Sequence, residues 1–185
     1  MFKFIKELFK FREELKDSIK QHEENRKRYL AMSNEELAQL QDEALFEAAL
    51  IRTENEVDMY DDMIEGINSL IGAKKNFYIT SYYEMEVNNG GLCQFFVNSS
   101  RYVAPELSVA LDEIKALEHK KAFDTFIKKN NIDLNDLSSF DIEDVSEFEQ
   151  QNERYPFEAF DDAFYDMKPI QDYLTEYIEK NIEQF

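Results

Sequence analysis

The chain has 185 residues, of which 43% are hydrophobic, so it can bury one core and we expect a single domain. Its formal net charge of −19 opposes direct binding to DNA, RNA or anionic lipid and favours basic partners. The one cysteine, Cys93, excludes an intramolecular disulfide, and neither a membrane-span pattern nor a signal-peptide pattern is visible, so we expect a cytoplasmic protein.

The first element is predicted to be one long helix from Phe2 to about Tyr29. Its apolar positions follow the helical period and are Phe4, Leu8, Phe11, Leu15, Ile19 and His22. A basic amphipathic helix can dock on a membrane or a partner, but packing on its own domain or in a homodimer is the favoured interpretation. We therefore describe residues 1–30 as an N-terminal amphipathic helix and residues 31–185 as an acidic all-helical domain.

Two further helices are predicted before the middle of the chain. Ser33 and Glu36 form a capping box that opens the first of them. Thr53 is a candidate N-cap for the second, which is expected to run to Gly72. The predicted core face of this second helix consists of Val57, Tyr60, Ile64, Ile67 and Ile71. Beside it runs an acidic stripe that should face solvent, formed by Glu54, Asp58, Asp61 and Glu65.

The central stretch predicts a buried helix, a sharp turn and a second short helix. The first helix begins near Lys74, and the turn is at Asn88-Asn89-Gly90-Gly91, where Asn and Gly tolerate a left-handed backbone. We expect a positive φ at Gly90 or Gly91. The polar side chains around this turn are Glu86, Asn88, Asn89, Gln94 and Asn98. A hydrogen-bond network that ties the two helices together is a better interpretation of them than catalysis.

The remaining pattern is helical throughout. Helices are predicted after Pro105, around Phe123, around Phe148, after Pro156 and after Pro169, with an acidic connection near residues 133–140. The predicted fold is therefore all-α: a single irregular domain of about seven to nine helices with a long N-terminal helix.

Few residues suggest chemistry. Two histidines, His22 and His119, and one cysteine cannot form a histidine-rich or zinc site, so we expect neither a metal nor a cofactor. Asp61, Asp62 and Glu65 could bind a divalent cation, but a solvated face explains them better. An enzyme that uses Glu86 or the Asp61-Asp62 pair remains an alternative, although the chain is expected to be non-enzymatic.

The negative charge is concentrated in two blocks. Residues 31–72 carry eleven acidic residues and one basic residue, and residues 133–166 carry twelve acidic residues and one basic residue. In contrast, residues 1–30 carry nine basic and six acidic residues. If the two blocks act together, they should meet on one face of the molecule or continue one another across a dimer axis.

The central turn also carries a resemblance to a known family. The run Glu86-Val87-Asn88-Asn89-Gly90-Gly91, followed by Gln94-Phe95-Phe96 and Asn98-Ser99-Ser100, resembles a bacterial family of small acidic all-helical proteins. The best-known member of that family is a DNA-mimic protein. The resemblance covers about residues 58–129. The chain departs from the family pattern at Leu92, at Arg101 and at Ile114-Lys115-Ala116.

The resemblance implies an acidic surface that imitates the phosphates of DNA and binds a basic, nucleic-acid-binding protein such as a transcription factor. The candidate partner-binding residues are Glu54, Asp58, Asp61, Asp62, Glu65, Asp141, Glu143, Asp144, Glu147, Asp161 and Asp162. A homodimer is compatible with this interpretation. Two alternatives remain: the acids only keep the protein soluble, or they form an immunity-like inhibitor of a basic toxin or nuclease.

Overall fold

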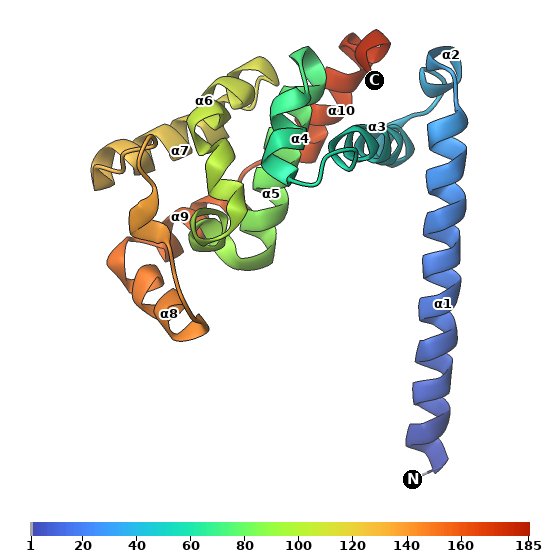
Figure 1. Ribbon diagram of the computed structural model, residues 1–185, viewed down its shortest axis with the longest axis horizontal. Coiled ribbons are helices and arrows are strands. Elements are labelled where there is room, and N and C mark those ends of the chain that lie inside the picture. Colours follow the sequence, from blue (N-terminus) through green and yellow to red (C-terminus); the bar gives the residue numbers. More distant parts are fainter. Residues whose placement is uncertain (1) are drawn as a thin grey trace.

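The computed structural model describes residues 2–185, and every regular element among them is a helix (Figure 1). The α-helices are α1 (Phe2–Ala31), α2 (Asn34–Leu37), α3 (Asp42–Val57), α4 (Met63–Ser69), α5 (Gly72–Val97), α6 (Ala104–Glu113), α7 (Leu117–Asn130), α8 (Val145–Arg154), α9 (Phe157–Tyr165) and α10 (Ile170–Lys180). Three short 3-10 helices are η1 (Ser99–Val103), η2 (Ser138–Phe140) and η3 (Ile182–Gln184). The all-α prediction is confirmed.

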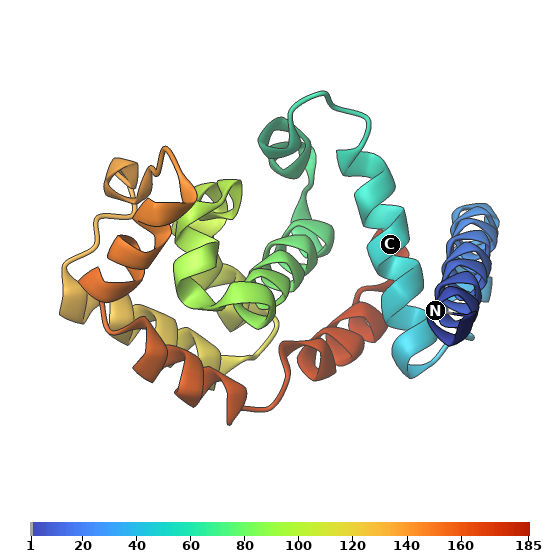
Figure 2. The ribbon, with the colours of Figure 1, turned by 90° about the horizontal axis from the view of Figure 1, so that it is seen from below.

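Helix α5 is the centre of the fold, and the later helices surround it (Figure 2). Its two halves meet in one aromatic cluster because the ring of Tyr83, before the turn, packs edge-to-face against the ring of Phe95, after it, at 5.2 Å. Phe123 of α7 and Phe164 of α9 pack on the same tyrosine ring. Buried aromatic pairs of this geometry add about 0.5–1.5 kcal/mol each beyond their buried area. The cluster therefore holds α7 and α9 against both halves of α5.

Helix α10 begins at a buried carboxylate rather than at a local cap. The residue before it is Pro169, whose side chain cannot accept a hydrogen bond. Instead, Glu84 of α5 accepts hydrogen bonds from the backbone N–H groups of Ile170 at 2.6 Å and Gln171 at 3.0 Å. Burial raises the pKa of Glu84, and the two backbone hydrogen bonds oppose that rise. The carboxylate thus supplies in trans the acceptor that a helix N-terminus requires.

Helix α1 is attached to the molecule only near its C-terminal end (Figures 1 and 2). There Tyr29 is buried, and its hydroxyl donates a hydrogen bond to Glu47 of α3 at 3.0 Å. Arg26 forms an ion pair with Asp58 at 3.2 Å. The preceding turns project away from the body. The predicted apolar positions Phe4 and Leu8 lie outside the residues whose side chains are described.

The helix predicted from Thr53 to Gly72 is wrong. Thr53 lies inside α3, where its hydroxyl donates to the carbonyl of Ala49 at 2.8 Å. The chain leaves the helix after Val57 and begins α4 only at Met63, because the carboxylate of Asp62 accepts the backbone N–H of Glu65 at 2.9 Å.

This break changes which of the predicted core residues are buried. Tyr60 and Ile71, which were assigned to the core, are 45% and 81% exposed. The capping box of Ser33 and Glu36 is confirmed, but the helix that it opens, α2, ends at Leu37.

Candidate protein-binding surface

The turn in α5 has the geometry that its glycines permit. Gly91 has φ of 76° and ψ of 177°, whereas Gly90 has φ of −159°. The expected positive φ is therefore confirmed at Gly91. The turn brings the two halves of α5 together. Glu86, on the first half, accepts hydrogen bonds from Gln94 at 2.8 Å and from Asn98 at 2.9 Å. Asn88 and Asn89 are exposed and contribute neither of these bonds.

Helix α9 fixes the same turn from outside. The carboxylate of Asp161 accepts the backbone N–H of Leu92 at 2.8 Å, and the hydroxyl of Tyr165 donates to the carbonyl of Val87 at 2.9 Å. Burial raises the pKa of Asp161, while its hydrogen bond to Leu92 lowers it. Asp161 was among the candidate partner contacts, but its half-buried carboxylate is already used inside the fold. Sequence spacing gave no signal for this contact, because 69 residues separate the two groups.

The first acidic block does not form the continuous stripe that was predicted. Glu54 is half-buried on α3, and its pKa is raised, chiefly by burial and then by the neighbouring Asp58. Asp61 and Asp62 lie in the connection between α3 and α4, and Glu65 lies on α4, all three exposed. These acids therefore occupy a helix end, a loop and a second helix rather than one helix face.

The second acidic block surrounds α8, and several of its acids have local structural roles. Asp144 caps α8 and accepts hydrogen bonds from the hydroxyl and the backbone N–H of Ser146, which lower the pKa of Asp144. Glu147 accepts the backbone N–H of Glu143 at 2.6 Å. Asp141 forms an ion pair with Arg101. The candidates with exposed side chains and no such role among the described contacts are Glu143 and Asp162.

A shallow hollow joins this second block to the turn in α5. It encloses about 330 Å³ and is lined by Gln94, Val97 and Asn98 on one side. Its other side is formed by Ile142, Glu143 and Asp144 of the segment that leads into α8 and by Phe148 on α8. The polar network of the turn and the acidic segment are thus parts of one surface.

The two acidic blocks do not pack against each other. In both views α5 lies between α3 and α4 on one side and α8 on the other (Figures 1 and 2). The expectation that the blocks meet on one face is therefore not met within a single chain. A common surface would require a second copy.

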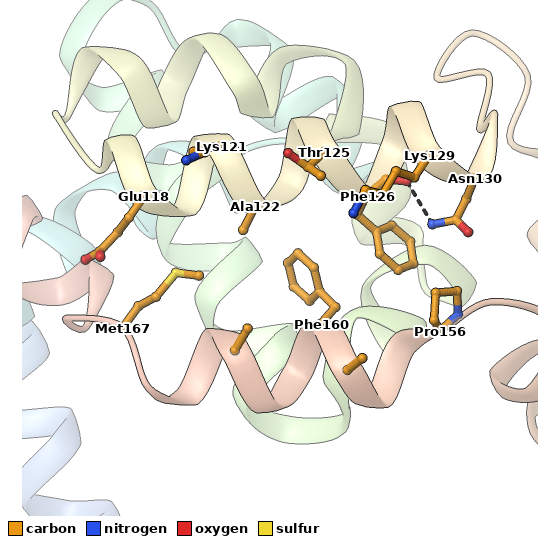
Figure 3. Close-up of a pocket in the computed structure, with 12 residues that line it drawn as sticks. Glu118, Lys121, Ala122, Thr125, Phe126, Lys129, Asn130, Pro156, Phe160 and Met167 are labelled. Carbon is orange, nitrogen blue, oxygen red and sulfur yellow. Dashed lines mark hydrogen bonds between the residues drawn. The ribbon is translucent and has the colours of Figure 1, made fainter.

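A larger cavity lies elsewhere, between α7 and α9 (Figure 3). It encloses about 630 Å³, and its lining is mostly apolar. Neither Glu86 nor the Asp61-Asp62 pair lines it. Among the described residues, no group of three or more His, Cys, Asp or Glu side chains is arranged to hold a metal ion. No described helix has the length and apolar character that a membrane span needs.

Comparison with known proteins gives one match. The model of the family described as DMP19-like protein matches residues 68–181, more than half of the chain. No curated protein and no solved structure matches. The matched segment includes α5 to α10 and all of the second acidic block, whereas the candidate residues Glu54 to Glu65 precede it.

Proposed function

The chain belongs to the DMP19-like protein family, and from that premise we propose that it is a non-enzymatic DNA mimic. Its partner is a basic protein that binds nucleic acid. The observation that carries this proposal is the position of the exposed acids of the second block, which lie within the family region and beside the turn network of Glu86, Gln94 and Asn98.

The spacing of the acids supports the proposal physically. Acids four residues apart on a helix, such as Glu149 and Glu153 on α8, are separated by about 6 Å along the helix axis. Duplex DNA presents a phosphate about every 3.4 Å along each strand, so the two charge densities are of the same order. A groove that neutralises phosphates with Lys and Arg can therefore accept such a surface, with a strong dependence on salt.

Capture and competition test the proposal. The protein would be immobilised and exposed to a lysate of the native cells, and bound proteins would be eluted with either NaCl or an excess of duplex DNA. If the immobilised protein is a DNA mimic, both NaCl and duplex DNA should release nucleic-acid-binding proteins from it, because DNA and the acidic surface compete for one site on each of them. Partners that salt releases but duplex DNA leaves bound would contradict mimicry. An inhibitor of a nuclease would instead abolish the activity of the captured protein on a non-competing substrate.

Matched variants then locate the surface. The first variant removes four exposed negative charges from the second block through Glu143→Gln, Glu149→Gln, Glu153→Gln and Glu158→Gln. The control removes four exposed charges from the first block through Glu35→Gln, Glu43→Gln, Asp61→Asn and Glu65→Gln. Both proteins have the same net charge. We expect the first variant alone to lose at least tenfold in affinity and to show a flatter dependence of affinity on salt. Equal losses for both variants would mean that only net charge matters.

A further inference from the structure

An apolar stripe on α1 is not covered by any other described part of its own chain. Phe11, Leu15 and Ile19 follow one another at intervals of four residues and are 60%, 46% and 58% exposed. At 100° per residue they lie on one side of the helix, and the first and last are about 12 Å apart along its axis. Large apolar side chains grouped in this way, on a helix that projects from the body, mark a contact surface.

A second apolar surface on the same chain is a groove that can hold this stripe. The α7–α9 groove is the 630 Å³ cavity described above, and its floor is formed by the rings of Phe126 and Phe160, whose centroids lie 5.4 Å apart (Figure 3). Ala122 on α7 and Ala159 and Ala163 on α9 line its walls, and their small side chains leave the space open. On α7 the lining extends from Glu118 to Asn130, about 18 Å along the helix axis, so the groove is long enough to hold the stripe.

Charges flank the groove and the stripe in a complementary way. On α7 the groove is bordered by Lys121 and Lys129, both exposed and without an ion-pair partner among the described residues. The one acid on this edge, Glu118, lies at the end of the groove and accepts a hydrogen bond from the hydroxyl of Tyr173 at 2.9 Å. The exposed acids Asp162, on α9, and Asp166, directly after it, follow Ala159 and Ala163 by three residues, on the outer side of the groove. One edge is therefore basic and the other acidic.

The α1 stripe has a basic edge that matches the acidic edge of the groove. Arg12 and Lys16 lie next to the stripe on the side towards Ile19, at 100° and 140° from Phe11. They can therefore face Asp162 and Asp166 when the stripe enters the groove. The N-terminal 30 residues also carry a net positive charge, in contrast to the acidic remainder of the chain. The basic edge of the stripe and the net positive charge of residues 1–30 both favour association of α1 with an acidic body.

We propose that α1 of one copy lies in the α7–α9 groove of a second copy, so that the protein is a dimer with exchanged N-terminal helices. The same chain cannot make this contact, because α1 is anchored on α3 at the opposite side of the molecule from α7 and α9 (Figures 1 and 2). A helix whose apolar residues are spaced by one turn and enter a hydrophobic groove is a common mode of recognition. Because the contact is reciprocal, each dimer contains it twice.

The test measures mass in solution by light scattering after size-exclusion chromatography. The wild-type chain of 22.0 kDa should elute with twice that mass. The stripe variant, Phe11→Ser with Leu15→Ser and Ile19→Ser, and the groove variant, Ala163→Arg, should both be monomers. All four positions are exposed, so the helical circular dichroism spectrum should be unchanged. Matched controls are Glu13→Ser with Lys20→Ser and Lys27→Ser on the opposite face of α1, and Ala38→Arg beyond α2, and they should remain dimers.

Mixing the two variants distinguishes this dimer from simple pairing of two α1 helices. In the mixture, the intact α1 of the groove variant can still enter the intact groove of the stripe variant, so heterodimers should form with a weaker affinity than the wild type. A groove variant that stays dimeric alone would show that α1 pairs with α1 and would overturn the proposal. A monomeric wild-type protein at micromolar concentration would overturn it as well.

Discussion

Gly91 occupies a backbone conformation that a residue with a Cβ rarely adopts. A Cβ built there would lie 2.2 Å from Oδ2 of Asp161, the carboxylate that holds Leu92. We predict that Gly91→Ala lowers the free energy of unfolding by about 1–3 kcal/mol from backbone strain alone. Gly90→Ala is the control for backbone strain, because its φ of −159° is ordinary, although the added Cβ would press on the Gln94 side chain that donates to Glu86. Urea denaturation measures both, and equal effects would contradict the prediction.

His119 predicts a dependence of stability on pH. One ring nitrogen, Nε2, lies 2.8 Å from the carbonyl of Lys168, and the other, Nδ1, is buried without a partner among the described groups. Burial lowers the pKa of His119, although Lys168 and Glu118 oppose the shift. In the unfolded chain the pKa is about 6.5, so the unfolded state takes up the proton first as the pH falls. The stability that the neutral ring contributes is therefore present above about pH 6.5 and is lost as the pH falls through the lower, folded-state pKa.

The corresponding variant is His119→Gln, whose amide can still donate to Lys168. Between pH 7 and pH 5 the unfolding free energy of the wild type should decrease more than that of the variant. The buried carboxylates Glu84 and Asp161 have raised pKa values and act in the opposite direction, but they are common to both proteins. Chemical denaturation at several pH values gives the difference. Parallel curves would contradict the prediction, because they would show that His119 takes up its proton equally in the folded and the unfolded state over this pH range.

At the scale of elements, the N-terminus of α10 is held on α5 by one side chain, that of Glu84. Glu84→Gln keeps one carbonyl oxygen for the backbone N–H groups of Ile170 and Gln171 but places an amide group against the other. An unsatisfied buried N–H costs about 1–3 kcal/mol, so we expect a loss of that order in the free energy of unfolding at neutral pH. Glu176→Gln, the same change at an exposed position on α10, should be nearly neutral. Thermal melting of both variants tests the prediction.

The elements that the sequence predicted well have their signals within a few residues. The capping box at Ser33, the glycine turn at Gly91 and the proline-initiated helices depend on local geometry, which periodicity and turn chemistry can reveal. The break between α3 and α4 was missed because Thr53 is also a favoured cap by residue type, although Asp62 ranks above it. Only the burial of Thr53 against Ala49 decides between them.

The same distinction applies to the candidate surface. Composition identifies the acidic blocks, and the spacing around the turn identifies Glu86, Gln94 and Asn98 as neighbours. Sequence spacing cannot show that the carboxylate of Asp161 accepts a hydrogen bond from the backbone N–H of Leu92, because that contact depends on how α9 packs across α5.

At the scale of the whole molecule, the net charge of −19 should make the folded state sensitive to salt. Raising the NaCl concentration from 0.01 M to 1 M shortens the Debye length from about 30 Å to about 3 Å, which screens repulsion between the exposed acids. We predict that Tm rises with salt for the wild type, and rises less for the variant with four neutral positions in the second block. Differential scanning calorimetry measures both. A fall in Tm would mean that ion pairs such as the one between Lys74 and Glu56 dominate instead.

Helix α10 packs against both α3 and α5, so it covers apolar surface on an element that is synthesised much earlier. Ribosomes add about 5–20 residues per second, and more than a hundred residues separate Val57 from Ile170. On the order of ten seconds therefore pass between the appearance of α3 and the appearance of the helix that completes its packing. During that interval the nascent chain exposes hydrophobic residues beside its first acidic block. The dense negative charge of that block would then act as a solubilising segment for the growing polypeptide, before any partner is present.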